Sequence, residues 1–212
     1  MTKAAFFAIA LLAAGCATST APVAAPSMEA PAVADTPIKS PSGEYNLDPR
    51  HTTVTWKVQH MGLSLYTARF DKTSGTLTLD GTSPTKSKVS ISIDAHSVST
   101  NLPMPGKEKF DAEIAKGIGA DKTPNITFVS TELVRTGPQS GRMIGDLTMN
   151  GITKPATFNI VLRGENTNLF GIGIGIEATG TIKRSDWGVD YAKAFAGDDV
   201  VIEVESDMNK KK

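Results

Sequence analysis

From Glu44 to Glu205, apolar and polar residues alternate along the chain with a period of two. In one such segment Val54, Trp56 and Val58 are separated by polar residues. Successive side chains of a β-strand point to opposite faces, so this alternation predicts strands with one buried and one wet side. Buried parallel strands would read as continuous apolar runs, and antiparallel pairing is therefore predicted. The pattern recurs in roughly eight segments: 54–58, 77–79, 89–95, 126–128, 147–149, 158–162, 172–182 and 200–204.

Turn residues separate these segments. Asp80-Gly81 and Asn150-Gly151 are dipeptides typical of tight turns between paired strands. Asn150-Gly151 predicts a hairpin, with a loop that extends to Pro155.

One region follows a helical period instead. Phe110, Ile114 and Ile118 recur every four residues among charged residues, after Pro105 and before Gly119. The spacing predicts a short amphipathic helix at about 105–118, with one apolar stripe.

The predicted fold class is all-β, and two architectures fit many two-faced antiparallel strands: a sandwich and a closed barrel. The strands that start at Val89 and Gly171 are expected to be long, and long strands at the edge of an open sheet would stay unpaired. We therefore favour an antiparallel barrel of about eight strands.

The first residues resemble a bacterial export signal. Lys3 precedes a short apolar run that ends at Gly15-Cys16, and Cys16 is the only cysteine. The segment before Cys16 also resembles a lipobox, which predicts a lipoprotein signal peptide at 1–15 and lipidation of Cys16. Simple cleavage near Ala14 is the alternative. The other predicted parts are an Ala/Pro-rich disordered tether at 16–43, a barrel at 44–206 and a basic tail at 207–212.

Composition and motifs exclude several classes of function. The formal net charge is zero, so no nucleic-acid partner is predicted. His51, His60 and His96 stand alone, without the converging ligands of a metal site. Ser130 has no nucleophile elbow around it, and we predict no catalytic residues and no cofactor.

Glycines alternate with isoleucines in the segment 171–176, with the glycines on one face and the isoleucines on the other. A strongly coiled strand explains them, and a smooth wall for a helix or ligand is the alternative.

The predicted inner face is apolar, and a barrel of this size is either solid or encloses one small ligand. A cavity with such a wall would take a hydrocarbon. The residues expected to bind it are Trp56, Val58, Phe70, Leu77, Ile91, Phe110, Ile114, Phe128, Leu147, Phe158, Ile160, Ile174 and Ile176.

Six segments, in order, resemble the YceI-like family of polyisoprenoid-binding periplasmic proteins. They begin at Asp48-Pro49-x-His51, Phe70, Val89, Pro124, Gly145 and Ile182, and the resemblance covers Tyr45 to Glu205. It implies a lipocalin-like barrel whose tunnel holds an isoprenoid chain, such as a polyprenyl phosphate or a quinone tail. It also implies no catalysis and often a dimer. Residues 107–111 and Thr123 depart from the family pattern beside the predicted helix, which leaves ligand identity and entry open.

These observations predict a non-enzymatic lipid carrier or buffer in the bacterial periplasm, anchored to the membrane through Cys16, with the outer membrane favoured. The first alternative is a solid barrel that serves as a structural module and docks a membrane enzyme. The second alternative is a lipid or amide hydrolase, against which the missing catalytic triad argues.

Overall fold

The computed structural model describes residues 31–103, 105–169 and 171–212. The strands are β1 (Gly43–His60), β2 (Ser64–Phe70), β3 (Thr73–Leu79), β4 (Lys88–Asp94), β5 (Val98–Thr100), β6 (Asn125–Arg135), β7 (Ser140–Met149), β8 (Ile152–Asn168), β9 (Gly171–Lys183) and β10 (Ala196–Lys210). The helices are α1 (Lys107–Gly117) and the 3-10 helices η1 (Pro84–Lys86), η2 (Ala95–Ser97) and η3 (Arg184–Trp187).

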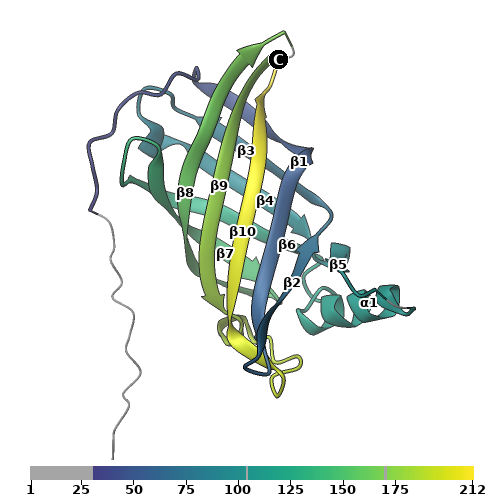
Figure 1. Ribbon diagram of the computed structural model, residues 1–212. Coiled ribbons are helices and arrows are strands. Elements are labelled where there is room, and N and C mark those ends of the chain that lie inside the picture. Colours follow the sequence, from purple (N-terminus) through teal and green to yellow (C-terminus); the bar gives the residue numbers. More distant parts are fainter. Residues whose placement is uncertain (1–30, 104, 170) are drawn as a thin grey trace, which may run out of the picture. The chain divides into compact units, whose positions relative to one another are not determined.

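Within the described residues, eight strands form a closed antiparallel barrel in the order β1-β3-β4-β6-β7-β8-β9-β10 (Figure 1). Pairing of β1 with β10 closes the barrel, which confirms the predicted barrel over a sandwich. The first part of β1 pairs with β3, while its last part, from Val54 to His60, pairs with β2. Strand β5 then pairs with β2 and extends the wall toward α1.

The Asn150-Gly151 hairpin is tighter than predicted. Asn150 and Gly151 have φ angles of 51° and 75°, and Met149 pairs directly with Ile152. A two-residue turn of this kind needs positive φ at both positions. The predicted loop to Pro155 is wrong, because Pro155 lies within β8 opposite Asp146. That part of β8 pairs with β7 alone, so the missing N–H of proline disrupts no second ladder.

Helix α1 confirms the helix predicted at about 105–118. It follows Gly106, whose φ of 96° suits glycine, and it buries Ile114 and Ala115 on its inner side. No helix in residues 31–103, 105–169 or 171–212 combines the length and apolar character needed to cross a bilayer.

Some predicted boundaries differ from the structure. The strand at Val89 is not long: β4 has seven residues and ends where the Asp94 carboxylate accepts the His96 N–H and starts η2. Strand β10 continues to Lys210, into the predicted tail, where the Lys210 ammonium donates to the Ser42 carbonyl at 2.6 Å.

Residues 31–42, which fall in the predicted tether, contact the barrel. The Ile38 N–H donates to the Gly81 carbonyl at 2.9 Å, and the Ser40 N–H donates to Glu165 at 2.6 Å. The predicted signal peptide and Cys16 lie outside the described residues.

The barrel interior holds two clusters of buried apolar side chains. One cluster is built around Phe128 and Phe158, whose rings meet edge to face with centroids 5.2 Å apart. The other cluster includes Tyr45, Ile174 and Met208. The barrel therefore has an apolar interior along its length.

Candidate functional site

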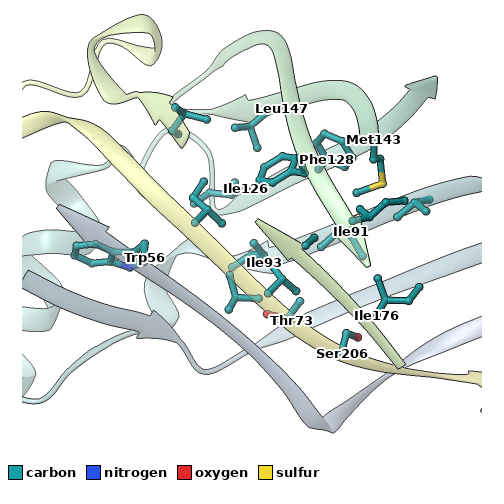
Figure 2. Close-up of a pocket in the computed structure, with 18 of the residues that line it drawn as sticks. Trp56, Thr73, Ile91, Ile93, Ile126, Phe128, Met143, Leu147, Ile176 and Ser206 are labelled. Atoms are coloured by element: carbon teal, nitrogen blue, oxygen red, sulfur yellow. The ribbon is translucent and has the colours of Figure 1, made fainter. Parts of the chain in front are cut away.

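A cavity of about 630 Å³ lies inside the barrel, and all eight barrel strands contribute to its wall. Figure 2 shows part of the wall, with Ile91, Phe128 and Leu147 among the side chains that face the space. The cavity forms because alternate residues of each strand point inward, and the inward ones are mainly Val, Ile, Leu, Phe and Met. Its size falls within the range of small-molecule sites.

The structure brings together every residue that the sequence predicted for ligand binding. All thirteen line the cavity, together with other residues: Trp56, Val58, Phe70, Leu77, Ile91, Phe110, Ile114, Phe128, Leu147, Phe158, Ile160, Ile174 and Ile176. Their binding of a ligand stays a prediction. His60 also lines the cavity, at the end of β1.

Sequence reasoning missed several parts of the wall. Val200, Ile202 and Val204 of β10 line the cavity, and their alternation was already visible in the sequence. Met143 also lines it, in a part of β7 where glycines interrupt the alternation. Ile38 lines it from the segment predicted as a tether, and no periodic signal marked it.

Gly171, Gly173 and Gly175 of β9 lie away from the cavity, whereas Ile174 and Ile176 line it. An added Cβ on Gly173 would lie 3.3 Å from the Asn209 side chain, and one on Gly175 would lie 3.5 Å from Cβ of Arg163. These glycines therefore do not form the wall that a ligand would touch.

Helix α1 covers one side of the cavity with Phe110 and Ile114. A carboxylate fixes it to β5: Asp111 Oδ1 accepts the Thr100 N–H at 3.1 Å and the Thr100 hydroxyl at 2.6 Å, and Asp111 Oδ2 pairs with Lys107. Burial raises the pKa of Asp111, but the hydrogen bonds from Lys107 and Thr100 outweigh it and the net pKa is lowered. The charged carboxylate therefore holds the helix in place.

Two polar atoms of the wall have no hydrogen-bond partner in the described part of the chain, Trp56 Nε1 and Tyr66 Oη. Their rings lie 6.2 Å apart and tilted by 45°. Arg184 also borders the cavity, but it donates to the carbonyls of Gly197 at 2.7 Å and Ala196 at 2.9 Å. The Arg184 guanidinium is thus hydrogen-bonded to backbone carbonyls.

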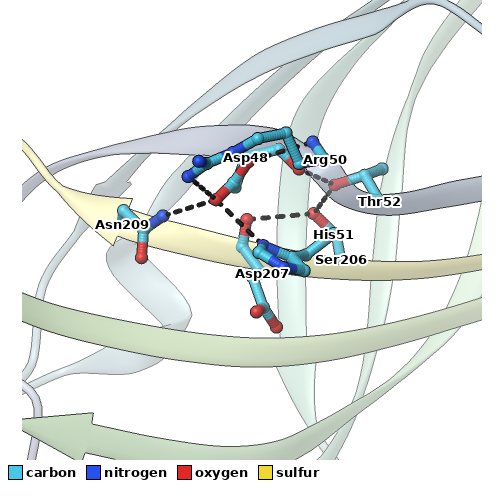
Figure 3. A network of polar contacts seen from close by, with 7 residues as sticks. All are labelled: Asp48, Arg50, His51, Thr52, Ser206, Asp207 and Asn209. Carbon is cyan, nitrogen blue, oxygen red and sulfur yellow. Dashed lines mark hydrogen bonds and ion pairs between the residues drawn. The ribbon is translucent and has the colours of Figure 1, made fainter. Parts of the chain in front are cut away.

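A polar network lies where β1 meets β10 (Figure 3). The Asp48 carboxylate accepts hydrogen bonds from the Arg50 N–H at 2.9 Å, from the Arg50 guanidinium at 3.0 Å and from Asn209 Nδ2 at 3.2 Å. His51 Nδ1 lies 3.1 Å from it. The Arg50 side chain and N–H, together with His51, hold the pKa of Asp48 well below its usual range.

Within the described residues, no three His, Cys, Asp or Glu side chains are grouped to hold a metal ion. The Ser130 hydroxyl is buried and accepts the Val89 N–H at 2.8 Å. The arrangement as a whole can enclose an apolar molecule.

Comparisons with known proteins agree with this geometry. The family model of the YceI-like domain matches residues 45–208. Protein YceI of Salmonella arizonae is 33% identical over 174 residues, which cover 80% of this chain and 89% of that protein. A UPF0312 protein of Pseudomonas putida (strain GB-1) is 33% identical over 151 residues, covering 70% of this chain and 77% of that protein.

Solved structures share the fold. BcnA of Burkholderia cenocepacia matches with a TM-score of 0.65 and 20% identity, over 76% of this chain and 98% of BcnA. A domain from Saccharophagus degradans, described as polyisoprenoid binding, matches with a TM-score of 0.54 and 13% identity, over 79% of this chain and 98% of that domain.

Proposed function

The chain belongs to the YceI-like domain family, and from that premise we propose that it binds the hydrocarbon tail of an isoprenoid or similar lipid, without catalysing a reaction, as a carrier or buffer in the bacterial envelope. The observation that carries this proposal is the apolar wall of the cavity, to which all eight barrel strands contribute. The description of the Saccharophagus degradans domain as polyisoprenoid binding supports it.

Burial of a tail supplies enough free energy for useful affinity. Each CH₂ group transferred from water contributes about 0.8 kcal/mol. Ten such groups contribute roughly 8 kcal/mol, which corresponds to a dissociation constant of about 1 µM before the costs of association. Such binding selects for chain length and shape more than for the head group, so both a polyprenyl phosphate and a quinone remain candidates.

The alternatives fit the geometry less well. A solid barrel that acts as a docking module would not contain a cavity of about 630 Å³. A hydrolase would need an accessible nucleophile with a base beside it, whereas Ser130 is buried and bonded to a backbone N–H.

The cellular location of the protein is part of the same proposal. A lipoprotein signal that ends before Cys16 would place the domain in the periplasm, attached to the outer membrane. Association into a homodimer is likewise proposed from the family resemblance.

Native mass spectrometry of the full chain with Cys16→Ser tests lipid binding, because this substitution prevents acylation from obscuring the bound mass. The protein is incubated with a quinone or a polyprenyl phosphate and freed of detergent. We expect one lipid per chain.

Two variants of one cavity residue address the location of the lipid. Ile176→Trp fills the space that Ile176 faces, and Ile176→Arg places a charge there (Figure 2). Thr181→Arg, on the exposed side of the same strand, is the matched control. Lipid should be lost from both Ile176 variants and retained by the control. If the Ile176 variants fold by circular dichroism and bind lipid at the wild-type ratio, the cavity is not the binding site.

A further inference from the structure

Two neighbouring loops at one end of the barrel expose large apolar side chains. The β1–β2 loop and the β9–β10 loop lie together at the lower end in Figure 1, and the Met61 N–H donates to the Phe195 carbonyl at 2.7 Å. On or beside these loops, Leu63 is 82% exposed, Met61 and Phe195 are each 57% exposed, Leu65 is 56% exposed and Tyr191 is 38% exposed. We call these five residues the apolar rim.

The apolar rim lies at one end of the cavity. Tyr191 and Phe195 belong both to the rim and to the cavity wall. His60 and Tyr66, which flank the β1–β2 loop, line the same end. An apolar surface therefore continues from the outside of the molecule into the cavity.

The opposite end of the cavity is mixed at its border, where polar residues lie beside Pro84 and Pro138. Thr85, Arg135 and Gln139 line it there. The Thr85 hydroxyl donates to Asp35 at 2.6 Å, and Arg135 donates to the Thr36 carbonyl at 2.6 Å. Further exposed apolar residues, including Leu169 in the β8–β9 hairpin, lie away from the rim, and single apolar residues on a surface are common.

The size and charge of the rim indicate its partner. A large side chain has a full area of roughly 150–250 Å². Multiplied by the exposed fractions of the five rim residues, this gives an exposed rim area of about 600 Å². A stable protein interface buries more, ~800 Å² per partner. A bilayer needs no matching shape and accepts protruding apolar side chains. Lys193 and Asp190, both exposed in the β9–β10 loop, offset each other's charge. Attraction to a membrane would therefore be apolar rather than electrostatic.

We propose that the apolar rim inserts into a lipid bilayer and forms the entrance through which the lipid passes between the membrane and the cavity. This inference rests on the proposed lipid binding. A tail that moves along the rim into the cavity stays in apolar surroundings and avoids the unfavourable exposure of its hydrocarbon to water.

The test separates binding from loading. Leu63→Glu changes the most exposed rim residue, which does not line the cavity. Leu169→Glu is the matched control, since Leu169 is fully exposed at the opposite end and does not line the cavity either. Both are made in the full chain with Cys16→Ser. Two quantities are measured: the affinity for farnesol in solution, and the rate at which a fluorescent polyprenol leaves phosphatidylcholine vesicles for the protein.

Leu63→Glu is expected to keep the wild-type affinity for farnesol and to slow uptake from vesicles at least tenfold, since burial of one leucine is worth more than that factor. Leu169→Glu should load as fast as the wild type. Equal loading rates for all three proteins would refute the entrance but leave lipid binding intact. A wild-type dimer that Leu63→Glu dissociates, detected by sedimentation, would make the rim a self-interface and overturn the proposal. Failure of the wild type to bind either lipid would refute the proposed function itself.

Discussion

Asp48→Asn tests whether one buried carboxylate stabilises the closure of the barrel. Between Leu47 and Thr52, β1 bulges away from its regular pairing with β10. Asp48 lies in this bulge with 7% of its surface exposed, and it joins residues of the bulge to Asn209 of β10 (Figure 3). Asparagine keeps the shape of the side chain but removes its charge. Its NH₂ group also replaces one of the two carboxylate oxygens that accept hydrogen bonds, so that two donors would face each other there.

The contacts set the expected magnitude. A hydrogen bond to a charged group contributes a net 1.5–3 kcal/mol, roughly. The ion pair with Arg50 adds little, because the Arg50 side chain is 79% exposed to water, which screens the attraction. The bonds from the Arg50 N–H and from Asn209 dominate. We expect Asp48→Asn to lower the free energy of unfolding by about 2–3 kcal/mol. Arg50→Ala should lower it much less, because the Arg50 N–H bond to Asp48 is kept and only a water-screened ion pair is lost.

The effect should depend on pH. The folded state lowers the pKa of Asp48, so the unfolded state binds more protons in acid. The stabilisation is therefore fully present above the ordinary aspartate pKa of about 3.9 and is lost as the pH falls below it toward the folded value. Denaturant unfolding at pH 7 and at about pH 3 measures this, and the gap between wild type and Asp48→Asn should narrow in acid. A gap that stays constant, or an Arg50→Ala variant as unstable as Asp48→Asn, would refute the reasoning.

Two other substitutions have defined outcomes. Asp111→Asn weakens the attachment of α1 to Thr100. Amide hydrogen exchange within α1, measured by mass spectrometry at pH 7, should therefore accelerate at least roughly tenfold. Unchanged exchange would show that apolar packing alone holds the helix. Gly180→Ala places a Cβ 2.7 Å from the Phe158 ring, and thermal unfolding should show the protein destabilised by about 1–3 kcal/mol. Gly164→Ala is the control: no atom lies within 4 Å of its new Cβ, so it should show no loss of stability from crowding.

The sequence was informative where one physical rule controls the backbone. Alternation placed Trp56 and Val58 of β1, and Ile174 and Ile176 of β9, on the cavity wall, because a strand with one buried face fixes its register. The period of four in α1 likewise placed Phe110 on the wall. Their position on the cavity wall could be predicted without knowing which strands pair with each other.

The remaining features depend on contacts between distant segments. The bulge at Asp48 has local bonds from Arg50 and Thr52, but its bond from Asn209 joins residues 161 positions apart. Ile38 reaches the wall because its N–H meets the Gly81 carbonyl. Local patterns do not encode such pairings. The short β4 is different, since the capping contact of Asp94 with His96 is local and competed with the strand pattern.

The closed ladder explains why the barrel does not collapse onto the space that its inward side chains leave. Two packed sheets can move together until their side chains meet, but the perimeter of a closed barrel is set by strand number and stagger. Eight strands, paired around the described barrel through the contact of β1 with β10, hold the wall apart whichever apolar residues line it. Truncating one lining residue should therefore enlarge the cavity rather than collapse it. It follows that lipid binding depends on the wall as a whole, so that blocking the space at Ile176 should affect binding far more than any single alanine substitution in the wall.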